Sequence, residues 1–540
     1  MKNPCLTRPL HGLALLALAC AAPPAAAQCE TDLVTAGDAV LTDSFGGGLD
    51  LDGQRLIAGK PRFVSAAYDD DSAYVFDRGL GGWNQTAKLT PQMTASAQDF
   101  GAAVAVRGDT AVIGDPGGTG QAFFSGRAHV FELGPGGWTE MATLAASDGG
   151  FSERFGASVA LDASQTRAVV GAFFDDGRGA AYVFEGSGSS WTQVAKLQAD
   201  LGASGVNFAN SVAIDGDRIL IGDWVATDKG FDAGAAYVFD RQPNGQWMQT
   251  AKLLASDGAP GDNFGIDVSV EGGRALVGAC GDDLQRGSAY VFELVGSSWI
   301  EMDKVVASDG APGDLYGISA RLSGDRAILG ARSKSNNTGA AYLVERLPGG
   351  SWIETAPLTT AGVAAGWTFG EKVALSGDVA AVGAPGDGVT GAPHAGSVHV
   401  YKASPGGSLF GTGSVVSLAT GGVQSFELAT CPPRPLLPYL LLGSASGTSP
   451  GVMTDGLVLP LALDSYLLYT LEQPNVPPYA NSFGVLDAAG EATAAFTVPP
   501  GLPPSAAGLT LNHAFAVIEL LPTLLAVVQV SNPVPIDLVP

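Results

Sequence analysis

Residues 100–114, with the sequence FGAAVAVRGDTAVIG, decide the fold. An aromatic residue and a glycine precede an alternating apolar stretch, a Gly-Asp pair and a second apolar stretch that ends in glycine. Alternation with a period of two predicts β-strands, and Gly-Asp is typical of a tight hairpin in which the glycine takes a positive φ. The segment therefore predicts an antiparallel β-hairpin.

The same segment recurs at a fixed distance along the chain. Its opening aromatic residue stands at seven positions: Phe45, Phe100, Phe155, Phe208, Phe264, Tyr316 and Phe369. Successive positions lie 52 to 56 residues apart, and a constant period of this length indicates a repeat architecture. We expect the repeats to start near residues 43, 98, 153, 206, 262, 314 and 367.

Each repeat contains two further strands. The third is typified by Ala73-Tyr74-Val75-Phe76, and the fourth contains a tryptophan such as Trp83. Four short strands in about 50 residues form one blade of a β-propeller, so we predict an all-β, seven-bladed propeller over residues 28–404. The seventh repeat lacks a tryptophan strand, and we expect the N-terminal strand 31–36 to close that blade.

These repeats resemble the FG-GAP repeats that build the propeller of integrin α chains and of many secreted bacterial proteins. The Phe-Gly half is clear in most copies, and the Gly-Ala-Pro half is complete at Gly383-Ala384-Pro385. The resemblance implies a binding or adhesion propeller. Family members that bind calcium carry an Asp-rich loop between the first and second strands, where this sequence has mostly a two-residue turn. We therefore expect no cofactor and no metal site, because the usual calcium loops are absent, with calcium binding as the alternative.

The composition changes after residue 407 to leucine and proline with few charges. Apolar runs separated by glycine and proline turns predict a C-terminal β-sandwich of Ig-like character over residues 408–540. The apolar stretch from Phe515 to Val530 contains Glu519 and Pro522, and we interpret it as two strands around a turn.

The N-terminus has the three parts of a secretory signal peptide: Lys2 and Arg8, an apolar run, and Ala25-Ala26-Ala27 before Gln28. We predict a signal peptide over residues 1–27 and a secreted or cell-surface protein without a transmembrane segment in the mature chain. Lipidation at Cys20 is a minor alternative. Cys29, Cys280 and Cys431 would remain, and a disulfide between Cys29 and Cys431 would tie the tail to the ring.

The formal charge of −25 argues against a nucleic-acid partner, because such a surface repels polyphosphate. The long loops connect the second strand to the third and one blade to the next, and strand alternation puts both sets on one face of the ring. The candidate ligand-binding residues on this face are Asp69, Asp70, Asp71, Asp175, Asp176, Trp224, Asp228, Asp282, Asp283 and Trp367. Carboxylates beside aromatic side chains suit a surface protein or a glycan as partner.

No catalytic constellation emerges. His129 and His399 occupy the position of Tyr74 in other blades and are interpreted as packing residues, and no metal-ligand spacing occurs. The leading hypothesis is a secreted or cell-surface, non-catalytic binding scaffold that uses the long-loop face. The alternatives are a polysaccharide-acting hydrolase that uses carboxylates on the same face, and a purely structural cell-surface component.

Overall fold

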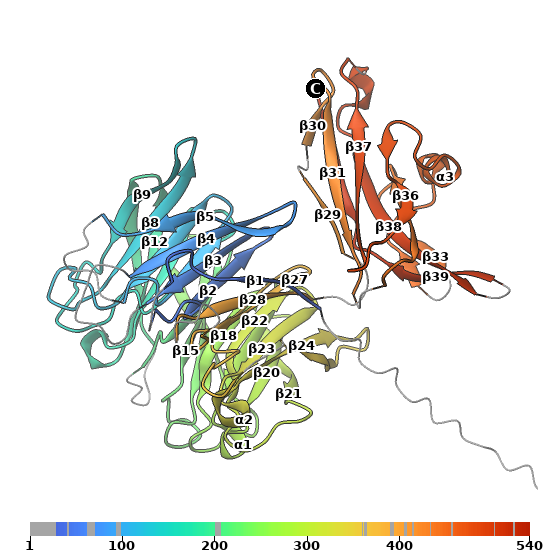
Figure 1. Ribbon diagram of the computed structural model, residues 1–540. Coiled ribbons are helices and arrows are strands. Elements are labelled where there is room, and N and C mark those ends of the chain that lie inside the picture. Colours follow the sequence, from blue (N-terminus) through green and yellow to red (C-terminus); the bar gives the residue numbers. More distant parts are fainter. Residues whose placement is uncertain are drawn as a thin grey trace, which may run out of the picture.

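The computed structural model describes residues 29–39, 43–61, 71–92, 99–199, 207–358, 360, 364–388, 394–403, 408–412, 415–431, 434–454, 457–501, 503–521 and 524–540. The predicted signal peptide, Asp69 and Asp70 lie outside these ranges. The described part is all-β, as the sequence predicts, and it is built mostly from four-stranded antiparallel sheets (Figure 1).

Seven four-stranded sheets fill the described residues between Glu30 and Lys402. We call them blades 1 to 7. Blade 1 contains β2 (Gly48–Asp52), β3 (Arg55–Lys60), β4 (Ser72–Gly79) and β5 (Gly82–Leu89); blade 2 contains β6 (Val104–Arg107), β7 (Thr110–Asp115), β8 (Arg127–Gly134) and β9 (Gly137–Leu144); and blade 3 contains β10 (Ser158–Leu161), β11 (Arg167–Ala172), β12 (Ala180–Ser187) and β13 (Ser190–Leu197). Blade 4 contains β14 (Ser211–Asp215), β15 (Arg218–Asp223), β16 (Ala235–Arg241) and β17 (Trp247–Leu253); blade 5 contains β18 (Phe264–Glu271), β19 (Arg274–Ala279), β20 (Ser288–Val295) and β21 (Ser298–Val305); and blade 6 contains β22 (Tyr316–Ser323), β23 (Arg326–Ala331), β24 (Ala340–Arg346) and β25 (Trp352–Leu358). Blade 7 contains β26 (Val373–Ser376), β27 (Val379–Ala384), β28 (Ser397–Lys402) and β1 (Glu30–Val34).

The sheets form a closed ring around an axis lined by their first strands. Each first strand contacts the first strand of the next blade, and β26 contacts β2. The N-terminal strand β1 is the outer strand of blade 7, where it pairs antiparallel with β28. The Glu30 carboxylate lies 2.7 Å from Nδ1 of the buried His399. The first and the last parts of the propeller sequence thus share one sheet.

The Phe-Gly signature has a direct packing cause. The Phe264 ring is fully buried and meets Tyr290 of the same blade edge to face, with 5.4 Å between ring centroids. At the blade 5 to blade 6 junction, a Cβ added to Gly278 would lie 2.0 Å from the carbonyl oxygen of Gly317. Gly317, which follows the repeat aromatic Tyr316, has a φ of +83°. In most repeats these two glycines therefore allow adjacent blades to approach closely.

The Gly-Asp hairpins also connect blades. Arg55 of β3 forms ion pairs with Asp77 at 2.7 Å and with the hairpin residue Asp109 of the next blade at 2.8 Å. The same guanidinium lies 5.2 Å from the ring centroid of Trp138, a fourth-strand tryptophan of that next blade. The repeated tryptophans and hairpin aspartates therefore join neighbouring blades.

The C-terminal residues form two further sheets that share one hydrophobic core. The first contains β29 (Ser408–Gly411), β31 (Gly422–Ala429), β37 (Glu491–Val498) and β35 (Tyr479–Ala480), and the second contains β30 (Val415–Ser417), β40 (Val534–Val539), β38 (Thr510–Leu521), β32 (Pro438–Ser444) and β36 (Phe483–Val485), with β39 (Leu524–Val530) beside β38. The helix α3 (Ser465–Glu472) and the hairpin of β33 (Val452–Thr454) and β34 (Leu457–Leu459) complete this C-terminal unit.

The structure confirms the interpretation of residues 515–530, because β38 and β39 pair antiparallel there. Within the described ranges, no helix has the length and apolar character needed to cross a membrane.

A disulfide between Cys29 and Cys431 joins the ring to the C-terminal unit. Beside it, the guanidinium of the half-buried Arg78 in β4 lies 4.6 Å from the ring centroid of Phe410 in β29. The Gly81 amide also donates a hydrogen bond to Glu427 of β31. The turn between β4 and β5 thus contacts the C-terminal unit, on the ring face that carries the short hairpins.

Candidate functional site

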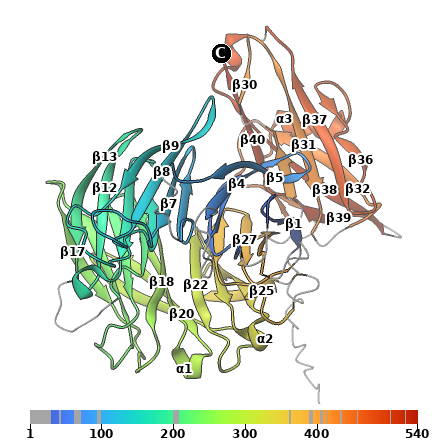
Figure 2. The same ribbon diagram turned by 60° about the vertical axis from the view of Figure 1, so that its left-hand side comes forward.

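The long loops lie at the end of the ring away from the C-terminal unit. Short helical turns mark two of them, α1 (Asp282–Gln285) in blade 5 and α2 (Lys334–Asn337) in blade 6. Both turns appear at the lower end of the ring in Figures 1 and 2, with the C-terminal unit above. We call this end the long-loop face.

Several of the predicted aspartates on the long-loop face are bound by tyrosine and lysine side chains of the same blade. In blade 3 the Tyr182 hydroxyl lies 2.9 Å from Asp148 and 2.7 Å from Asp175 and can donate its one hydrogen to either carboxylate. The Lys196 ammonium lies 2.7 Å from each of the same two carboxylates. Asp175 is itself buried. We call this arrangement a Tyr-Lys-Asp cluster.

The cluster recurs because the strand register repeats. In blade 5 Tyr290 lies directly across from Lys304, and these side chains bind Asp257 and Asp282. Each of the Lys304 contacts with the two carboxylates measures 2.7 Å. Burial alone would raise the pKa of Asp257, but the hydrogen bonds from Lys304 and Tyr290 bring that pKa below its usual value. Asp257 is therefore an ionised group, and the contacts with Tyr290 and Lys304 fix the loops that carry Asp257 and Asp282 to the blade.

The remaining predicted residues occupy different environments and do not converge on one point. Asp71 accepts a hydrogen bond from the Asp99 amide at 2.8 Å, and Asp228 lies 2.5 Å from the Lys252 ammonium. Asp176 and Asp283 keep 77% and 61% of their side chains exposed. Trp224 and Trp367 are half-buried and belong to loops of different blades.

A concave site of about 600 Å³ lies on the long-loop face at blade 5. Asp262, Asp282 and Asp283 line it together with the aliphatic side chain of Leu284. Burial raises the pKa of Asp262, and the neighbouring charges of Asp282 and Asp257 add to this effect. This concavity brings together two of the predicted residues, Asp282 and Asp283.

Five large, exposed apolar side chains of the face were not predicted from the sequence. We call them the apolar crown: Phe123 (58% exposed), Phe151 (72%), Phe174 (44%), Phe231 (75%) and Leu284 (79%). They extend from loops of blades 2 to 5. Phe123 and Phe151 stack on one another, with 6.4 Å between ring centroids. Large apolar side chains gathered on an exposed face are typical of interaction surfaces.

Main-chain hydrogen bonds hold the loops that carry the crown to neighbouring loops. The Ser152 amide donates to the Phe123 carbonyl at 3.3 Å, and the Gly261 amide donates to the Phe231 carbonyl at 2.9 Å. Leu284 itself has a φ of +61°, which is costly for a residue with a branched side chain. The crown side chains are thus exposed on loops that have a fixed main-chain conformation.

One buried carboxylate beside the crown has an unused oxygen. Glu153 is 7% exposed, and its Oε2 has no hydrogen-bond partner among the described residues. Burial raises the pKa of this carboxyl, as do the charges of Asp175 and Asp176.

Among the described residues no three His, Cys, Asp or Glu side chains are placed to hold a metal ion. In blade 1 the first and second strands are joined by a turn of two residues, Gly53 and Gln54, with Gly53 at a φ of +58°.

A closed ring of repeated four-stranded sheets with long loops on one face defines a β-propeller protein. The model of the FG-GAP repeat matches residues 83–131, 138–184, 191–239, 247–292, 299–344 and 352–401. These segments make up more than half of the sequence, and the chain belongs to the FG-GAP repeat family. Among curated proteins none matches the sequence.

Solved structures with a similar course of the chain have low sequence identity. A putative 6-phosphogluconolactonase from Bacteroides uniformis is 11% identical with a TM-score of 0.38, covering 58% of this chain and 85% of that one. The β-propeller domain of the Trilobed protease from Pyrococcus furiosus is 8% identical with a TM-score of 0.36, covering 65% and 90%. AofleA from Arthrobotrys oligospora is 11% identical with a TM-score of 0.37, covering 63% and 91%.

Proposed function

We propose that the protein is a non-catalytic binding scaffold of the cell surface or the extracellular space, and that it recognises a protein partner through the long-loop face. The observation that carries the proposal is the apolar crown. Its five side chains, between 44% and 79% exposed, stand on loops that main-chain hydrogen bonds hold to neighbouring loops. Such a surface stabilises a complex when a partner removes it from water.

The chemistry of the face favours a protein over a glycan. Phenylalanine and leucine supply apolar contact area without a polar group for sugar hydroxyls, and the clusters around Tyr182 and Tyr290 already use the nearby carboxylates. Exposed carboxylates such as Asp176 and Asp283 surround the crown and favour a partner with basic residues at its rim. The disulfide between Cys29 and Cys431 supports an oxidising location.

The test is an array of extracellular proteins and glycans probed with the full mature chain. We expect one or more protein ligands, and we expect the double variant Phe123→Ser/Phe231→Ser to lose at least tenfold in affinity. Val295→Ser is the matched control, because Val295 is 59% exposed but ends β20 on the opposite face. Binding that the crown variant retains would reject the surface, and ligands found only among glycans would reject the protein partner.

A further inference from the structure

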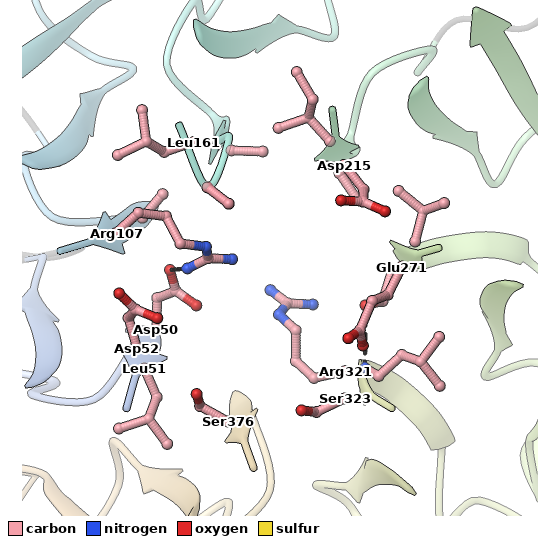
Figure 3. Close-up of a pocket in the computed structure, with 18 of the residues that line it drawn as sticks. Asp50, Leu51, Asp52, Arg107, Leu161, Asp215, Glu271, Arg321, Ser323 and Ser376 are labelled. Atoms are coloured by element: carbon pink, nitrogen blue, oxygen red, sulfur yellow. Dashed lines mark hydrogen bonds and ion pairs between the residues drawn. The ribbon is translucent and has the colours of Figure 1, made fainter. Parts of the chain in front are cut away.

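A cavity of about 260 Å³ lies on the axis of the ring, between the first strands of the blades. It is separate from the long-loop face, because its charged lining residues stand at the short-hairpin ends of those strands. These residues are Asp50, Asp52, Arg107, Asp215, Glu271 and Arg321 (Figure 3). This cavity has no part in the binding proposed for the long-loop face.

The guanidinium groups of Arg107 and Arg321 point into the cavity from different blades (Figure 3). In each guanidinium group, one nitrogen is bound by a carboxylate. Nη1 of Arg107 lies 2.8 Å from Asp50, and Nη1 of Arg321 lies 2.8 Å from Asp267, which is 4% exposed. Among the described residues, Nε and Nη2 of both side chains form no hydrogen bond. Two fixed guanidinium groups thus present free donors to the same cavity.

The position of Arg107 breaks a repeated pattern. At most junctions a side chain at the end of the first strand accepts a hydrogen bond from a hairpin amide of the next blade, as Asp52 does from Gly108 at 2.7 Å and Ser376 does from Gly53 at 2.9 Å. Arg107 ends β6 and cannot accept, and Gln165 of blade 3 accepts from the Asp109 amide instead. Departures of this kind from a local rule are typical of functional positions.

The opposite part of the cavity is acidic. Asp215 accepts from the Gly272 amide at 2.5 Å and Glu271 accepts from the Gly324 amide at 2.7 Å, each through one carboxylate oxygen. In Figure 3 both carboxylates lie on the side of the cavity away from Arg107. The second oxygen of each group can accept a further hydrogen bond.

We propose that this axial cavity binds a small zwitterion of the size of an amino acid or a dipeptide. Its carboxylate would lie between Arg107 and Arg321 and would accept hydrogen bonds from the guanidinium nitrogens that Asp50 and Asp267 do not engage. Its ammonium group would bind Asp215 and Glu271. A simple anion fits less well, because the cavity is lined by four carboxylates and only two guanidinium groups.

Isothermal titration of the full mature chain with diglycine tests the proposal. We expect saturable binding that Arg107→Gln weakens at least tenfold. The double variant Asp215→Asn/Glu271→Gln should have a similar effect, since its amide oxygens can still accept from Gly272 and Gly324. Ser323→Ala, a neutral change in the same lining, should change the affinity less than twofold.

Two controls decide the chemistry of the site. Glutarate, which has no ammonium group, should bind at least tenfold more weakly than diglycine to the unmodified chain. Absence of binding by diglycine would overturn the proposal, and so would glutarate binding that is equally tight and insensitive to the Asp215→Asn/Glu271→Gln change. If Arg107→Gln lowers the melting temperature markedly, the carboxylate variant decides the outcome. The crown variant Phe123→Ser/Phe231→Ser should leave diglycine binding unchanged, so this test is independent of the proposed protein partner.

Discussion

At the scale of single residues, the repeat signature is a set of close approaches between backbones. The glycine that ends the second strand faces the carbonyl of the residue after the repeat aromatic in the next blade. At the junction of blades 3 and 4 the residue after the repeat aromatic Phe208 is Ala209, an alanine with a φ of +70° in place of the usual glycine. The Ala209 oxygen would lie 2.3 Å from a Cβ added to Gly171. The second-strand glycine is thus required even where the other glycine is replaced.

Gly278→Ala should destabilise the ring by about 3 kcal/mol or more, because the added methyl group meets the Gly317 carbonyl and neither backbone can move without disturbing a blade. Urea denaturation measures the loss. Gly349→Ala is the matched control, because a Cβ there has no atom within 4 Å and the φ of Gly349 is not positive. Equal stabilities of the two variants would contradict the packing account.

His513 predicts how the C-terminal unit responds to acid. The imidazole is fully buried, its Nε2 lies 2.8 Å from the Tyr479 hydroxyl, and burial lowers its pKa to about 3. In the unfolded chain the same group has a pKa near 6.5 and binds a proton first. Stability should therefore fall as the pH drops from 6.5 towards 3, by on the order of 4 kcal/mol in all.

The measurement is hydrogen exchange of the peptide that covers β38, corrected for intrinsic rates, between pH 7 and pH 4. His513→Gln keeps an acceptor for Tyr479 but does not titrate in this range. Its protection should depend less on pH than that of the unmodified chain. The same pH dependence in both proteins would show that another group controls the transition.

The sequence was enough to predict the blades, but it did not show that several loop aspartates are bound by side chains of the same blade. The spacing of the aromatic residues was enough to predict the repeat, because every copy must bury an aromatic side chain at the same position. The burial of Asp175 and Asp282 depends on a tyrosine and a lysine that come from the third and fourth strands. A signal for these clusters was present, because Tyr182 and Lys196 recur at fixed positions and face each other across two strands.

The apolar crown could not be predicted in this way. Phe123 and Phe231 stand in loops of variable length, where no periodicity tells an exposed phenylalanine from a buried one. Their exposure is set by hydrogen bonds between loops, such as the bond from the Ser152 amide to the Phe123 carbonyl.

At the scale of elements, β1 is the strand on which the ring depends. It supplies the fourth strand of blade 7, and without it β28 would present an open edge. Removing residues 28–36 should therefore lower the unfolding temperature by 10 °C or more, as measured by calorimetry. The double variant Cys29→Ser/Cys431→Ser is the control, because it loses the disulfide but keeps β1. An unchanged melting curve of the truncated chain would contradict the role of β1.

At the scale of the whole molecule, the two faces of the ring have different surroundings. The short-hairpin face meets the C-terminal unit through the disulfide, Arg78 and Phe410. The long-loop face with the apolar crown lies at the other end (Figure 2). If the C-terminal unit is attached to a surface, the crown points away from that surface and is available to a partner.

The pairing of β1 with β28 also has a consequence for the order in which the protein is made. Glu30 and its partner His399 are 369 residues apart in the chain. At about 5 to 20 residues per second, a ribosome needs on the order of tens of seconds to cover that distance. The first strand to be synthesised is therefore among the last to find its place, and the ring is completed by the oldest part of the chain.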